Sequence, residues 1–180
     1  MTRLVLCRHA RSGDAAEAAQ LADALRDLPL AAVYTSPLER AAATAAPIAA
    51  AHAVEAIVVD DLREIDFGAA EGVPFDDLPS DVQRGLLEQP TATRFPGGES
   101  YADLRARVTA ALDDIVLRHP DATVAVVSHG GAIRAALASW LRMDEDAVFR
   151  LDQRYASVNV VEWTDGTPFV RVVNADRPTL

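Results

Sequence analysis

The chain has 180 residues, 50% of them hydrophobic, and carries a formal net charge of -10 at pH 7. This length is enough to bury one sizeable core, so we expect residues 1–180 to form a single domain. The excess of acidic residues disfavours binding to nucleic acid or anionic membranes. No apolar run approaches the ~20 residues that span a bilayer. The lone Cys7 excludes an internal disulfide and favours a reducing, cytoplasmic setting.

Short β-rich runs alternate with Ala- and Leu-rich stretches along most of the chain, a pattern typical of a layered α/β domain with a mostly parallel sheet. We predict strands at 3–8, 31–36, 56–60 and 123–129, and helices at 14–27, 37–52, 100–118 and 131–141. The tail contains two further strands joined at Asp165-Gly166, a turn pair that favours a hairpin. One strand is therefore expected to run antiparallel to its neighbour.

Residues 67–99 interrupt this alternation. They are rich in Gly, Pro and Asp and contain one short helical candidate, "DDLPSDVQRGLLE". Long irregular stretches in compact domains are often functional, so we expect a small cap over a site, with a plain surface excursion as the alternative.

Arg8 and His9 follow the first apolar run directly in "RLVLCRHARSGD". Ligands of open parallel sheets bind at the carboxyl ends of the strands, which makes this a candidate site. Successive strand residues point to opposite faces, so both side chains reach one pocket only if the strand ends there, and Ser12-Gly13 fits such an ending. The alternatives are an ion pair for Arg8 and a hydrogen-bonded core position for His9.

The segment "TSPLERAAATAAPIAA" predicts a helix start. Ser36 and Glu39 have the spacing of a capping box, and Pro37 suits the first helical position. Arg40 then lies in the first turn, where the helix dipole disfavours a cation unless an anion binds there. An ordinary surface turn is the alternative.

His129 ends the fourth predicted strand and precedes Gly130 and Gly131, which let the backbone approach a ligand closely. A carboxylate follows the third strand, although spacing does not choose among five candidates: Asp60, Asp61, Glu64, Asp66 and Glu71. Two arginines and two histidines beside a carboxylate would provide a phosphate site, a nucleophile and a proton donor.

Other kinds of site fit the sequence less well. The four histidines lack the spacing of metal ligands, so we expect neither a metal nor another cofactor. A P-loop needs a lysine, and all seventeen basic residues are arginine. A cysteine-dependent phosphatase would use a cysteine followed by five residues and an arginine. Counted from Cys7, the position of that arginine holds Gly13, so Cys7 is interpreted as a small strand residue.

Five segments taken in chain order carry a further signal: "LCRHARS", "TSPLERAAATA", "LREIDFGAAEG", "GGES" and "VVSHGGAIRAAL". In this order they resemble the histidine phosphatase superfamily, the phosphoglycerate mutase-like proteins, from residue 4 to about residue 141. The resemblance implies a three-layer α/β/α sandwich.

The resemblance also implies roles for individual residues. His9 would be the nucleophile that forms a phosphohistidine, and Glu64 the general acid and base. The phosphate pocket would consist of Arg8, Arg40, His129 and the amide of Gly130.

The chain departs from the family pattern in three places. The usual Arg-His-Gly reads Arg-His-Ala, the loop with Thr, Trp-Asn and Gly-Arg is missing, and Ala70 stands where many relatives have Trp. The short 67–99 segment favours a phosphatase for a small-molecule phosphoester. A mutase and a non-catalytic phosphate-binding domain are the alternatives, and the sequence leaves the phosphoester and the oligomeric state open.

Overall fold

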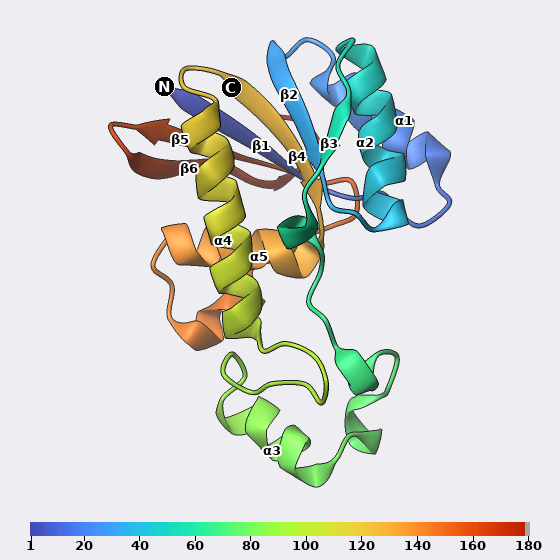
Figure 1. Cartoon of the computed structure of the whole chain (residues 1–180), viewed down its shortest axis with the longest axis vertical. Helices are drawn as coiled ribbons and strands as arrows, with labels where there is room; N and C mark the ends of the chain where they lie inside the picture. The colour runs from blue at the N-terminus through green and yellow to red at the C-terminus, as the bar shows by residue number, and fades with distance from the viewer. Residues whose placement is uncertain (179–180) are drawn as a thin grey trace.

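The computed structural model describes residues 1–178, with only the backbone of residues 145 and 146. In this part of the chain six strands form one sheet in the order β3-β2-β4-β1-β5-β6 (Figure 1). Their bounds are Thr2–Arg8 for β1, Leu30–Thr35 for β2, Ala56–Val58 for β3, Thr123–Ser128 for β4, Val158–Thr164 for β5 and Thr167–Ala175 for β6. The first four are parallel, whereas β5 is antiparallel to both β1 and β6, which confirms the mostly parallel sheet and the terminal hairpin.

Helices cover both faces of the sheet (Figure 1). Helices α1 (Ala15–Leu25) and α2 (Glu39–Ala51) lie on one side, and α4 (Tyr101–Arg118) and α5 (Gly130–Trp140) lie on the other. The elements fall within a few residues of their predicted positions. The three-layer α/β/α sandwich is confirmed.

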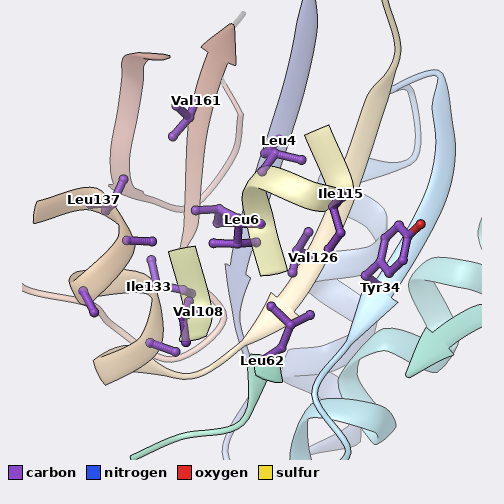
Figure 2. Packing of buried hydrophobic residues seen from close by; sticks show 14 of the residues in the cluster. Leu4, Leu6, Tyr34, Leu62, Val108, Ile115, Val126, Ile133, Leu137 and Val161 are labelled. Carbon is purple, nitrogen blue, oxygen red and sulfur yellow. The ribbon is translucent and has the colours of Figure 1, made fainter. Parts of the chain in front are cut away.

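The pleat of β1 feeds both halves of the core. Leu4 and Leu6 pack with α4 and α5 in the cluster of Figure 2, whereas Val5 and Cys7 pack against α1 and α2. Burial raises the pKa of Cys7 to about 12, so this thiol is a neutral core group. No helix within residues 1–178 is long and apolar enough to cross a membrane.

The predicted capping box at the start of α2 is wrong. The helix begins at Glu39, its N-cap is Leu38, and no side chain caps it. The Ser36 hydroxyl lies instead 2.7 Å from Nε2 of His129, and it accepts a bond from the Leu38 amide. A tertiary contact has therefore replaced the local cap. Arg40 still lies in the first helical turn, as predicted.

Residues 67–99 project from the sandwich and include the short helix α3 (Ser80–Glu88) (Figure 1). A small apolar cluster of its own holds this segment together. Its two ends meet where the Glu99 amide donates to the Asp66 carbonyl at 2.8 Å. A Cβ at Gly98 would lie 2.2 Å from that carbonyl oxygen, so the close approach requires glycine.

Candidate active site

His9 and His129 lie side by side at the carboxyl edge of the sheet, as predicted. They follow the neighbouring strands β1 and β4 directly, and the His9 amide donates to the Ser128 carbonyl at 2.9 Å. Their ring centroids are 5.0 Å apart at an angle of 61°. Both side chains are almost completely buried.

Hydrogen bonds fix the orientation of the His9 ring. Nδ1 lies 2.7 Å from the Ala10 carbonyl oxygen, which can only accept, so Nδ1 holds the proton. Nε2 keeps its lone pair and accepts from Nε of Arg40 at 3.2 Å. Burial lowers the pKa of His9, and the charges of Arg40 and Arg8 lower it further. The ring is therefore a neutral imidazole with a nucleophilic nitrogen beside a cation.

His129 is also held neutral. Burial lowers its pKa to about 3, and the positive charges of Arg40 and Arg8 add smaller contributions. When the Ser36 hydroxyl donates to Nε2, Nδ1 holds the proton, and this buried Nδ1 has no partner among the described residues. Sequence reasoning assigned Ser36 to a helix cap, although its place directly after β2 indicated the same edge of the sheet.

Arg8 forms no ion pair within residues 1–178, so the alternative of a carboxylate partner is not seen. One terminal nitrogen donates to the Gln153 carbonyl, and the guanidinium carbon lies 3.8 Å from the centroid of the Tyr155 ring. Nε is buried without a partner in this part of the chain. A Cβ at Gly130 would lie 3.3 Å from that Nε, so the glycine keeps the guanidinium close to the start of α5.

Sequence reasoning missed Gln153 and Tyr155. The Tyr155 ring also contacts His9, with centroids 5.6 Å apart. A usable signal was present, since both residues precede the predicted antiparallel strand. The start of such a strand lies at the same edge of the sheet as the end of the antiparallel strand beside it, here β1.

Glu64 sits at the N-terminus of α5. Its Oε1 accepts from the Ile65 amide and its Oε2 from the Gly131 amide, both at 3.0 Å. A Cβ at Gly131 would lie 2.3 Å from Oε1, so only glycine leaves room for the carboxylate. Glu64 shares a cavity of about 320 Å³ with Arg40, which Asp66 and Glu71 also line.

Arg107 of α4 holds the backbone around Glu64 in place. Its terminal nitrogens donate to the carbonyls of Asp61, Arg63 and Glu64 at 2.8–2.9 Å. Its Nε donates to Glu99 at 2.7 Å, and this ion pair lowers the pKa of the Glu99 carboxyl. Nothing in the sequence pattern singled out Arg107, because its role depends on where the chain returns in space.

The two neutral histidines predict a loss of stability in mild acid. As the pH falls through 6.5, the ordinary pKa of histidine, the unfolded chain binds protons at His9 and His129 more readily than the folded chain does. The free energy of unfolding is expected to fall by up to about 1.4 kcal/mol per pH unit for each of them. Urea unfolding at pH 7.5 and 5.5 in phosphate-free buffer measures this free energy. In His129→Gln the free energy of unfolding should depend less steeply on pH. Greater stability at pH 5.5 would contradict it.

Three comparisons with known proteins show what the chain is similar to in sequence and in fold. The family model "Histidine phosphatase superfamily (branch 1)" matches residues 5–176. The bifunctional protein Rv2228c of Mycobacterium tuberculosis is 40% identical over 149 residues, which are 81% of this chain and 41% of that protein. Phosphoserine phosphatase 1 of Hydrogenobacter thermophilus is 33% identical, and the match covers 89% of this chain and 86% of that protein.

Among solved structures, Bacillus stearothermophilus YhfR superposes with a TM-score of 0.87 at 26% identity, covering 97% of this chain and 98% of its own. The chain spans only about two fifths of Rv2228c. Because the family model covers nearly the whole chain and the relatives share its sequence and its fold, the chain belongs to branch 1 of the histidine phosphatase superfamily.

Proposed function

We propose that this chain hydrolyses phosphomonoesters without a metal ion, through a phosphohistidine formed on His9. The observation that carries the proposal is the state of the His9 ring, with Nδ1 bound to a carbonyl and the lone pair of Nε2 beside Arg40. Arg8 Nε is a buried donor without a partner among the described residues, and so is His129 Nδ1 when Ser36 donates to Nε2; both suit the oxygens of a phosphoryl group.

In the first step Nε2 of His9 attacks phosphorus and the bond to the leaving oxygen breaks. Arg8, Arg40 and His129, with the amide of Gly130, stabilise charge on the phosphoryl oxygens. Glu64 gives its proton to the leaving alkoxide, which departs as an alcohol.

In the second step water attacks phosphorus and the bond to His9 Nε2 breaks. Glu64, now a carboxylate, takes the proton from this water. The products are inorganic phosphate and the starting enzyme, so the cycle balances without a co-reactant. Hydrolysis is favoured over mutase chemistry because a mutase must retain and reorient a bisphosphorylated intermediate, and the 67–99 segment is small.

The test is hydrolysis of p-nitrophenyl phosphate in excess EDTA, from mildly acidic to neutral pH. We expect activity to survive chelation and to persist below pH 6.5, because the lowered pKa keeps His9 neutral there. An alkaline quench, which preserves phosphohistidine, should trap phosphate on His9. Loss of activity on chelation would refute metal independence. Phosphate that is trapped on His9 and never released would favour a phosphate-binding domain.

Gly131→Ala is expected to separate activity from stability. The new methyl group would meet the Glu64 carboxylate and displace it, whereas alanine is a better helix former than glycine. Activity on alkyl phosphates should fall by about tenfold or more, because the proton donor moves. The melting temperature should stay equal or rise slightly. Unchanged activity on alkyl phosphates would show that the position of Glu64 is unimportant.

A further inference from the structure

Glu64 also lines a second cavity, which the proposed mechanism does not use. It has a volume of about 340 Å³, and Glu64 and Gly131 line it together with residues of the 67–99 segment. Glu64 also lines the cavity that contains Arg40. Glu64 is therefore shared between the cavity that contains Arg40 and a cavity that contains Tyr101 and Phe149, and Ile65 and Phe67 also line both.

The walls of this second cavity are aromatic. Phe67 and Phe95 of the 67–99 segment meet with ring centroids 5.0 Å apart. Tyr101 and Phe149, from outside the 67–99 segment, meet with ring centroids 5.1 Å apart. Aromatic faces offer dispersion contacts and edge-to-face packing to a further ring, and they offer no conventional hydrogen-bond acceptor to hydroxyl groups.

The proton donor fixes how a phosphoester would lie between the two cavities. In the proposed mechanism Glu64 must reach the leaving oxygen while the phosphoryl group sits at Arg40 and His9. The aromatic cavity, which Glu64 also lines, then offers room for the rest of the leaving group. A polyhydroxylated leaving group would lose hydration there for few polar partners, whereas an aromatic ring would gain by leaving water.

We propose that the aromatic cavity is the leaving-group site and selects phosphomonoesters whose leaving group carries an aromatic ring. The inference rests on the proposed function, since the direction of the leaving group follows from His9 and Glu64. It gives residues 67–99 the role of a cap, because Phe67 and Phe95 supply one wall.

Arg134 is the one cation on the walls of this cavity within the described residues, and its Nε donates to the Leu151 carbonyl at 2.7 Å. A leaving group with a carboxylate, such as serine, would need this guanidinium as its anchor. Arg134 and Glu64 are the charged residues among the described lining residues, and most of the other side chains on these walls are apolar. The aromatic class is therefore favoured, and phosphoserine becomes the competitor in the test.

The experiment compares three esters of primary alcohols: 2-phenylethyl phosphate, ethyl phosphate and phosphoserine. We expect kcat/KM for 2-phenylethyl phosphate to exceed both others by about 10-fold or more, from burial of the ring. Equal values, or a preference for phosphoserine, would overturn the inference while leaving the proposed function intact. No hydrolysis of any ester, p-nitrophenyl phosphate included, would count against the proposed function.

A binding measurement keeps the inference testable in that last case. By calorimetry, 2-phenylethylphosphonate should bind about 10-fold more tightly than ethylphosphonate, and equal binding would overturn the proposal. Phe149→Ala should reduce this ratio several-fold. Phe169→Ala is the matched control, because Phe169 is exposed to a similar degree, 42% against 47%, and lies on β6 away from the cavity. An equal effect of both substitutions would also contradict the assignment.

Discussion

Replacing His9 by alanine is expected to lower turnover of p-nitrophenyl phosphate by about 10³-fold or more. The phosphate pocket would keep Arg8, Arg40 and His129, yet no atom would remain to form the covalent intermediate. Water would then have to attack the ester directly, without the neutral imidazole nitrogen that the fold holds beside Arg40. The measurement is kcat of the purified variant, together with the amount of phosphate that the alkaline quench traps on the protein, which should fall to zero.

The control is His52→Ala, which removes another histidine at the C-terminal end of α2. This variant should keep wild-type turnover and wild-type melting. The His9→Ala protein should also melt cooperatively, so that lost activity is not lost folding. A His9→Ala variant that keeps a substantial fraction of wild-type activity would refute the role of His9.

Local patterns were enough to predict the scaffold and one edge of the site. The β-rich runs around Leu6 and Val126 are buried on both faces, so they appear in the sequence as continuous apolar stretches. Each run ends at a residue of a different kind, Arg8 or Ser128, and the parallel register brings these ends together. The convergence of His9 and His129 therefore followed from strand position alone.

The errors and omissions concern contacts between distant residues. Ser36 satisfies a local capping pattern, yet its hydroxyl contacts His129, 93 positions away. The choice of Glu64 among five carboxylates depended on family resemblance, because what distinguishes it is a bond to the Gly131 amide. Arg107 reaches three carbonyls that lie over forty residues earlier in the chain. These contacts depend on tertiary structure: the pairing of β2 with β4 brings Ser36 to His129, and the packing of α4 and α5 places Arg107 and Gly131 beside the Glu64 segment.

Replacing Glu64 by glutamine is expected to lower kcat/KM by about 10²-fold or more for esters with poor leaving groups, and by less for good ones. An alkoxide needs a proton as it departs, whereas p-nitrophenolate leaves without one. The measurement is kcat/KM across phosphomonoesters that range from p-nitrophenyl phosphate to simple alkyl phosphates. The variant should depend more steeply on the acidity of the leaving alcohol than the wild type does.

The dependence of kcat/KM on the acidity of the leaving alcohol distinguishes loss of the proton donor from displacement of the side chain at position 64. Glutamine has one acceptor oxygen where the carboxylate has two, so it can satisfy the Ile65 or the Gly131 amide but not both. Any resulting shift of the side chain would disturb all substrates alike, whereas loss of the acid spares good leaving groups. Glu71→Gln is the matched control, because Glu71 lines the same cavity as Arg40. An equal loss with all esters would show that Glu64 is not the acid, and a steeper slope in Glu71→Gln would transfer the role to Glu71.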